Sequence, residues 1–551
     1  MKSMTMPPPT ISRLVATVAI FAVLSPISIA DANDVPTYWK DVRPILRKNC
    51  SFCHSSRLIR KPSVSGGLAL DSYENIFEGT KGKTKVLKVG NSSNSLMIQL
   101  LFSKNPNRRM PLDGDPLPDH QIEVLKRWID GGAKEGTVPD DIAKATIPRK
   151  PRKRRFRDVV LPTTTTPPRG HFGKSTPTLL DLRIKVGPLA PVTAVAFHPK
   201  GNVLATGAYG QVTVWDLKTI RPVKVLTSFL GAVNDVRFSP DGKFLAVGGG
   251  QPSARGELRL FQVSDWKNVA TARDHSDVVF SVAFRPDSQE LVSVSFDQTI
   301  RRWSVPKLDH RTTIKGHSDF VYAVDFGPQG ELLATVSKDR TVRLTEVESG
   351  KGRFTLGGMK EDVLSVAFHP NGKYVVSSGF ESALYWWNTE TGTRDKLQRG
   401  HRAAVQELAF SNDGKLLVSA SADQYVRIWN GSSGGSIRAI RVNSPVYAVA
   451  ISPDSRWIAT GTFDGFVRLW DARGTHALTL LSLPSEDQKH RWLAHTPVGY
   501  VSTTKELTKQ ARWTMRGRQI DDASAWKTLQ SPRMVQQDLR GKRLPAPKFF
   551  K

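Results

Sequence analysis

A unit of about 42 residues recurs seven times in this 551-residue chain. Each unit has a strand that ends in an aromatic or similar residue, and the intervals between successive ends are 46, 42, 42, 42, 42 and 41 residues. These end positions are Trp215, Phe261, Trp303, Thr345, Trp387, Trp429 and Trp470. Turns rich in Pro, Asp and Gly precede them, beginning at His198, Ser239, Arg285, Gly327, His369, Ser411 and Ser452. Fixed turn offsets with four short strands per unit predict seven blades in one closed β-propeller.

The units resemble WD repeats over roughly residues 187 to 472. Trp215-Asp216 and Trp470-Asp471 keep the family's terminal dipeptide. Two units match its network of His, Ser or Thr, Asp and Trp, namely His275, Ser293, Asp297 and Trp303, and His401, Ser419, Asp423 and Trp429. Other units depart from it, since Phe261 and Thr345 replace Trp and Glu381 replaces Asp. The resemblance implies that these side chains tie each blade together rather than catalyse a reaction.

The propeller is expected to span residues 185 to 475 and to present a docking surface for a protein partner, as the resemblance implies. Its blades need not end where the repeats end. An outer strand such as the one from Leu179 to Val186 could complete the last blade and close the ring.

The only two cysteines of the chain lie together in Cys50-Ser51-Phe52-Cys53-His54, the C-x-x-C-H pattern of covalent haem c attachment. The spacing lets both thiols reach the vinyl groups of one porphyrin edge and directs His54 to the iron. A structural zinc site would need two further Cys or His ligands in register, and no second pair exists. A thioredoxin-like disulfide would need a βαβ setting, whereas the flanking sequence has helical spacing. The pattern therefore predicts one covalently attached haem c.

The second axial ligand is expected to be Met110, which lies in the polar loop Asn107-Arg108-Arg109-Met110-Pro111-Leu112. Met97 is the competitor, but it belongs to the apolar run Leu96 to Leu101, where packing explains it. His and Met together raise the reduction potential and leave no open iron position. The predicted site therefore favours electron transfer, and the chain is not expected to be an enzyme.

Residues 37 to about 135 resemble the cytochrome c domain common in exported planctomycete proteins. The match includes Asp41 to Leu46, Cys50 to His54, Gly66-Gly67-Leu68, Arg109-Met110-Pro111 and Arg127 to Ala133. The resemblance implies a small all-α domain in which Cys50, Cys53, His54 and Met110 hold the haem. Leu112 stands where the family more often has a second Pro. Apolar residues at helical spacing before Cys50 and after Pro118 predict the two helices that cross over a haem edge.

Residues 1–32 have the form of a signal peptide, with Lys2 and Arg13 before an apolar run from Leu14 to Leu24 and a cleavage site ending at Ala32. An uncleaved anchor would need about 20 apolar residues, and this segment is shorter and contains Pro26. We therefore expect an exported, periplasmic protein with no transmembrane anchor after cleavage.

The formal net charge is +29, and much of it falls in two segments. Residues 141–184 form a linker rich in basic residues, Pro and Thr, expected to be extended and unpacked, and residues 484–551 form a basic C-terminal extension. Nucleic acid is not expected as a partner, because no reader motif is present and the chain carries an export signal. Solvated charge, an anionic surface or polysaccharide, and an acidic redox partner remain open explanations of the charge.

The expected fold class is therefore multidomain, with a small all-α cytochrome c domain followed by an all-β, seven-bladed WD-repeat propeller. The expected function is electron transfer by an exported haem protein whose propeller docks a redox partner. The alternative is an exported interaction scaffold in which the haem is a redox sensor or a structural element. Neither interpretation identifies the electron donor or acceptor.

Overall fold

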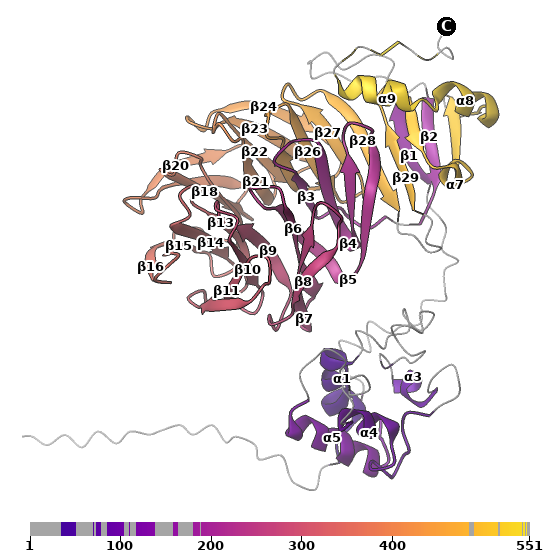
Figure 1. Ribbon diagram of the computed structural model, residues 1–551, viewed down its shortest axis with the longest axis vertical. Helices are drawn as coiled ribbons and strands as arrows, with labels where there is room; N and C mark the ends of the chain where they lie inside the picture. The colour runs from indigo at the N-terminus through magenta and orange to yellow at the C-terminus, as the bar shows by residue number, and fades with distance from the viewer. Residues whose placement is uncertain are drawn as a thin grey trace, which may run out of the picture. The chain divides into compact units, whose positions relative to one another are not determined.

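The computed structural model divides the chain into two compact units, Met1–Ala145 and Thr146–Lys551 (Figure 1). It describes residues 35–50, 70, 73–78, 85–103, 110, 117–137, 158–163, 180–187, 189–483, 490–515, 518–540, 542, 544–545 and 547. The expected signal peptide, residues 1–32, lies outside the described residues. No helix in the described part of the chain is long and apolar enough to cross a membrane.

The described part of the N-terminal unit consists of helices and loops. Its helical elements are η1 (Tyr38–Val42), α1 (Arg43–Asn49), α3 (Tyr73–Glu78), α4 (Leu96–Leu101) and α5 (Asp119–Asp130). The last of these, α5, follows Pro118 and ends at Gly131, where the sequence predicts its start and stop. It packs against η1, and its Leu125, Trp128 and Ile129 are buried in the core of the unit. The predicted entry and closing helices are thus both present.

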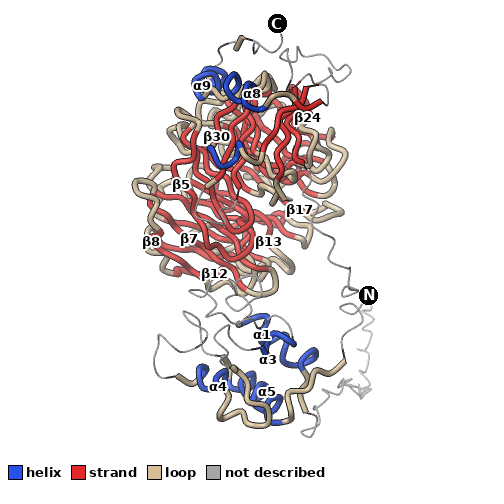
Figure 2. The backbone as a smooth tube through the Cα atoms, turned by 90° about the vertical axis from the view of Figure 1, so that its right-hand side faces the viewer, coloured by secondary structure: helices blue, strands red, loops and turns tan. Residues whose placement is uncertain are grey.

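The C-terminal unit contains seven blades of four antiparallel strands each, which confirms the propeller (Figures 1 and 2). The first two blades share one sheet, formed by β3 (Ala194–Phe197), β4 (Val203–Asp216), β5 (Arg221–Phe238), β6 (Phe244–Gln251), β7 (Arg255–Gln262) and β8 (Asn268–Ala272). In this sheet β4 folds back at Gly210, whose φ is +75°, and β5 continues from the first blade into the second. Two long strands therefore serve as two blade strands each.

The other five blades follow the repeat directly. They are β9 (Val279–Phe284) to β12 (His310–Ile314), β13 (Val321–Phe326) to β16 (Gly352–Leu356), β17 (Val363–Phe368) to β20 (Arg394–Arg399), β21 (Val405–Phe410) to β24 (Ser436–Arg441), and β25 (Val446–Ile451) to β28 (His476–Leu483). Between their ends lie β10 (Glu290–Ser295), β11 (Ile300–Ser304), β14 (Leu332–Ser337), β15 (Val342–Glu346), β18 (Tyr374–Gly379), β19 (Ala383–Asn388), β22 (Leu416–Ser421), β23 (Tyr425–Asn430), β26 (Trp457–Thr462) and β27 (Val467–Asp471).

The ring closes without the outer strand expected near residues 179–186. That strand exists as β2 (Leu180–Lys185), but it lies in a separate sheet between β1 (Asp158–Thr163) and β31 (Ala511–Met515), with β32 (Arg518–Gln519) at the far edge. The outer place in the last blade is filled by β28, which pairs directly with β27. Closure is instead made by β3, which packs against β25 and β26. Just before β3, the Val192 N–H donates to the carbonyl of Thr462, the last residue of β26, at 3.1 Å.

The segment expected to be an unpacked linker, residues 141–184, therefore contains two strands. Register pairs β1 with β2 from Asp158↔Lys185 to Thr163↔Leu180. The alternating side chains of Leu180, Leu182 and Ile184 are completely buried, and that apolar face is the physical reason for folding. The sequence analysis predicted an unpacked linker because Thr, Pro and basic residues surround both strands and dominate the composition of the segment.

The C-terminal extension is also folded. After the last blade, β29 (Arg491–His495) and β30 (Val501–Thr503) extend its sheet, and α7 (Lys505–Thr508), α8 (Asp522–Leu529) and α9 (Pro532–Leu539) follow. In both views α8 and α9 lie over the same end of the strands, with α9 packed on β28 and β30 and α8 on β31 (Figures 1 and 2). Trp513, Leu529 and Val535 are completely buried, so the extension carries core residues as well as charge.

Candidate functional site

Cys50, the first residue of the haem-attachment pattern, caps the C-terminus of α1. Its N–H donates to the Leu46 carbonyl at 2.8 Å, and its side chain is partly buried against the core of the N-terminal unit. The expected partners Cys53 and His54 lie outside the described residues. The helix before the pattern thus places the first thiol at the edge of an apolar cluster.

Met110 packs against the same apolar cluster as Cys50. Its N–H donates to the carbonyl of Leu100 in α4 at 3.0 Å, which fixes the backbone of the polar loop at this point. Met97 is different, since it lies within α4 and its side chain is buried in the cluster. Of the two candidate methionines, Met97 is therefore part of the core, and Met110 lies at its edge.

These residues fit a haem in donor chemistry and in surroundings. A thiol can form a thioether bond, a methionine sulfur is a known iron ligand, and both side chains pack against the apolar cluster that contains Tyr38, Leu46 and Trp128. Aromatic contacts stiffen this core, with ring centroids of Tyr38 and Tyr73 5.4 Å apart and those of Tyr73 and Phe77 5.0 Å apart. Among the described residues no group of three or more His, Cys, Asp or Glu side chains could hold a separate metal ion.

The His-Ser-Asp-Trp sets of the propeller form closed hydrogen-bond chains. In the third blade, Trp303 Nε1 donates to Ser293 Oγ at 2.8 Å, and that oxygen lies 2.7 Å from His275 Nε2. His275 Nδ1 then lies 2.8 Å from Asp297 Oδ2. Burial lowers the pKa of His275, so the imidazole is neutral and donates to the carboxylate. The set around His401 repeats these contacts.

A third chain of this kind was not among the sequence predictions. His317 Nδ1 lies 2.8 Å from Asp339 Oδ2, and its Nε2 lies 2.9 Å from Thr335 Oγ1. Thr345 stands in the Trp position of this blade, which obscured the match, although the spacing of His, Thr and Asp equals that of the two recognised sets. These buried histidines use both ring nitrogens within the blade, which supports a structural role.

The inner strands surround a cavity of about 460 Å³ that reaches the face carrying the turns between the first and second strands of the blades. Arg237 points into it, with ion pairs to Asp235 at 3.0 Å and to Glu407 at 2.8 Å. Burial raises the pKa of Glu407 to about 7 and that of Asp325 to about 6. Asp325 Oδ2 accepts from Phe368 N–H and Glu407 Oε2 from Val449 N–H, so these carboxylates also link neighbouring blades.

Comparison with known proteins identifies two families in the chain. The family described as WD domain, G-beta repeat matches seven segments, residues 182–216, 220–261, 266–304, 309–345, 350–388, 393–430 and 434–471. The family described as Planctomycete cytochrome C matches residues 50–114, which include Cys50, Cys53, His54 and Met110. The chain therefore joins a planctomycete cytochrome C region to seven WD repeats, as the sequence resemblances predicted.

Curated relatives match parts of the propeller. The chain is similar to pre-mRNA-processing factor 19 from Oryza sativa (32% identity over 131 residues, 22% of this chain and 24% of the relative). It is also similar to the LST8 homolog from Drosophila melanogaster (30% over 122 residues, 21% and 38%) and to protein HIRA from Homo sapiens (29% over 148 residues, 21% and 15%). The chain thus spans well under half the length of these relatives.

Proposed function

We propose that this fusion of a cytochrome C region and seven WD repeats is an exported c-type haem protein that transfers electrons and docks its partner on the propeller. The observation that carries the proposal is the pairing of the C-x-x-C-H pattern with Met110. Cys50 and Met110 come from segments 60 residues apart in sequence, yet both pack against one apolar cluster. That arrangement supports a site with two thioether bonds and two axial ligands.

In this proposal Cys50 and Cys53 would hold the haem covalently, and His54 and Met110 would coordinate its iron. When bound, the haem supplies reversible one-electron chemistry at its iron. The chain's own part is to supply the apolar cluster that includes Leu46, Leu125 and Trp128 and against which Cys50 and Met110 pack, and to hold the Met110 backbone through Leu100. With both axial positions filled by protein, the proposal assigns no substrate turnover.

The WD repeats suggest a protein-interaction platform, and we propose that its partner is a redox protein. The export pattern at residues 1–32 and the need for haem attachment outside the cytoplasm support a periplasmic location. The alternative, a scaffold with a sensing or structural haem, uses the same ligands. Reduction kinetics separate the two, since rapid reversible reduction by a donor protein supports the carrier and slow exchange supports the scaffold.

The first test is retention of haem under denaturing conditions. Acidified organic solvent extracts haem that is held only by coordination, whereas thioether-linked haem stays with the chain. We expect haem absorbance to remain with the precipitated polypeptide and to become extractable in a Cys50→Ser, Cys53→Ser double variant. Extraction from the unsubstituted protein would show that the assignment is wrong.

A further inference from the structure

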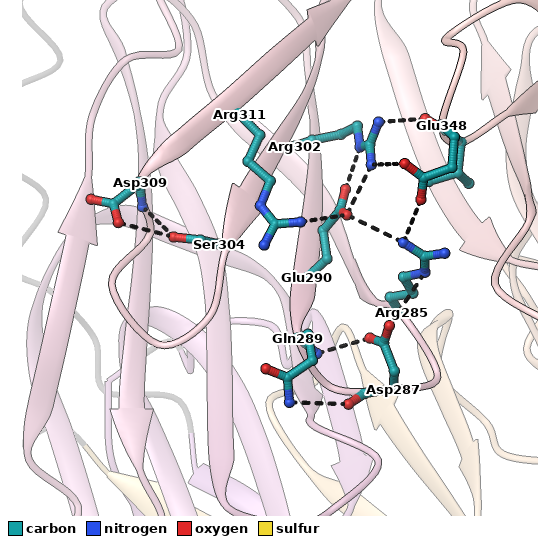
Figure 3. A network of polar contacts seen from close by, with 10 residues as sticks. Arg285, Asp287, Gln289, Glu290, Arg302, Ser304, Asp309, Arg311 and Glu348 are labelled. Carbon is teal, nitrogen blue, oxygen red and sulfur yellow. Dashed lines mark hydrogen bonds and ion pairs between the residues drawn. The ribbon is translucent and has the colours of Figure 1, made fainter.

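A buried carboxylate surrounded by three arginines lies in the third blade, beside the fourth (Figure 3). Glu290, the first residue of β10, is completely buried. Arg302 of β11 donates to it from both Nε and Nη2, the latter at 2.9 Å to Oε2. Arg311 Nη1 of β12 donates to the same oxygen at 3.3 Å, and Arg285 Nη1 lies 3.7 Å from it. We call Arg285, Arg302 and Arg311 the arginine cluster.

The repeat itself does not require these charges. Residues at the Glu290 position in the next three blades are Leu332, Tyr374 and Leu416, and those at the Arg302 position are Leu344, Trp386 and Ile428. A buried ion pair therefore stands where the other blades pack apolar side chains. Because such a pair is generally no more stabilising than well-packed apolar residues, fold stability alone does not explain it.

Glu348, in the turn after β15 of the fourth blade, already shows which ligand the arginine cluster accepts. Its Oε1 accepts a hydrogen bond from Arg285 Nη1 at 2.7 Å, and its Oε2 lies 3.8 Å from Arg302 Nη2 (Figure 3). The hydrogen bond from Arg285 lowers the pKa of Glu348, so the group is a carboxylate. The Glu348 side chain is 73% exposed, and exposed ion pairs contribute little stability, so another carboxylate can displace it.

The local charge balance favours an anion. The arginine cluster carries three positive charges, and Glu290 and Asp287, which lies 3.5 Å from Arg285 Nε, carry two negative ones. One positive charge is therefore left for Glu348 or for a ligand in its place. Arg311 is about half exposed, so a partner can reach it from solvent.

We propose that the arginine cluster binds a carboxylate of an acidic partner segment, and that Glu348 occupies this place when no partner is bound. The inference rests on the proposed docking function and names the partner's chemistry and its contact point. Guanidinium groups bind carboxylates through paired, charge-assisted hydrogen bonds. The net charge of +29 adds long-range attraction for an acidic segment.

The test measures binding of a fluorescent hexaglutamate peptide to the full chain by anisotropy at low salt. Glu348→Gln removes the internal competitor, and we expect roughly two- to fivefold tighter binding. Arg311→Gln removes an exposed charge-assisted donor, and we expect roughly tenfold weaker binding. Arg302 is left unchanged, because its loss would strand the buried Glu290 carboxylate.

Two matched variants separate a local site from general charge. Glu390 lies 42 residues after Glu348, in the equivalent turn of the next blade, and is exposed; among the described residues its side chain contacts no arginine. Glu390→Gln and, for the arginine, substitution of the exposed Arg438 of β24, Arg438→Gln, make the same charge changes elsewhere. Equal effects of Glu348→Gln and Glu390→Gln, or of Arg311→Gln and Arg438→Gln, would overturn the proposal.

A further measurement compares the binding of a phosphorylated peptide of equal charge with that of hexaglutamate. Tighter binding of this peptide than of hexaglutamate, with the same dependence on Arg311, would show that the ligand class is phosphate and that the carboxylate assignment is wrong. Haem retention under denaturing conditions is expected to be the same in these variants, because none of the substituted residues belongs to the N-terminal unit. Failure of the arginine site can therefore be told apart from failure of the proposed function.

Discussion

Burial separates the two methionines that could ligate iron. Met97 is part of the core of the N-terminal unit, whereas Met110 lies at its edge, where its N–H donates to the Leu100 carbonyl. The sequence made the same distinction, because Met97 lies in an apolar run and Met110 in a polar loop. Replacing Met110 and replacing Met97 should therefore have different effects on the protein.

We expect Met110→Ala to abolish the weak far-red band of the oxidised protein and to lower the reduction potential, since the iron loses its thioether ligand. Met97→Ala should do neither, but it should lower the free energy of unfolding by about 2–4 kcal/mol, because it leaves a cavity in the core. Absorption spectra and a redox titration measure the first effect, and urea unfolding measures the second. The opposite spectroscopic pattern would make Met97 the ligand.

We expect the Glu407 carboxyl to make the stability of the propeller depend on pH. Burial raises its folded pKa to about 7, so the folded state holds this proton more tightly than the unfolded state does. Its stabilising contribution is complete below the unfolded pKa of about 4.5 and is lost as pH rises through about 7. Asp325, with a pKa raised to about 6, acts in the same direction.

In Glu407→Gln we expect a smaller loss of stability between pH 5 and pH 8 than in the unsubstituted protein, because a neutral amide has no proton to lose. The difference is at most about 3 kcal/mol, from roughly 1.4 kcal/mol for each pH unit of pKa shift. Urea midpoints followed by tryptophan fluorescence at several pH values measure it. Glu390→Gln, at an exposed site, should retain the full slope, and parallel curves for all three proteins would contradict the assignment.

At the scale of elements, the sequence predicted the repeated blades of the propeller but not the features that occur once in the chain. Turn residues at fixed offsets located all seven blades, because their chemistry is local. One pairing partner of β2 is β31, which lies more than 300 residues later in the sequence, and a local residue pattern cannot reveal such a pairing. The Glu290–Arg302 pair was missed because the comparison of units followed the positions that they share. At the candidate haem site, the roles of Cys50, Cys53, His54 and Met110 all remain predictions. The structure places Cys50 and Met110 against one apolar cluster, and Cys53 and His54 lie outside the described residues.

The strands and helices after the last blade should be needed for its stability. A chain ending at Leu483 would lose β29, which pairs along β28, and would uncover Leu480 and Leu481. We expect this chain to be insoluble or to melt at a much lower temperature, because an apolar edge strand is exposed. A chain ending at Arg540 keeps α9 and should melt close to the full protein. Equal melting temperatures for both truncations would show that the extension contributes no core.

At the scale of the whole molecule, the chain consists of two bodies with separate cores, Met1–Ala145 and Thr146–Lys551. The sequence between the last described residue of the first body, Thr137, and the first strand of the second, β1, is poor in apolar residues, and seven of the nine residues from Arg149 to Arg157 are basic. Few apolar side chains are available there to offset the entropy of ordering the backbone. We therefore propose that the haem-bearing body folds independently and moves relative to the propeller, so that the propeller can hold a partner while the haem approaches it.

Limited proteolysis with trypsin tests this proposal, and the positions of Lys and Arg around β1 predict where the first cut falls. Seven of the nine residues from Arg149 to Arg157 are basic, whereas Asp158–Thr163, which pairs with β2, contains no Lys or Arg, and only Arg169 and Lys174 follow before β2. We expect the first cleavage between Arg149 and Arg157, which releases a fragment that retains haem absorbance and leaves a propeller with β1 still attached. Mass spectrometry of the two products locates the cut, and their separate melting temperatures should match the two transitions of the full protein. Resistance of residues 149–157 under conditions that digest an unfolded control would mean that this segment is packed, and the mobile-carrier interpretation would then fail.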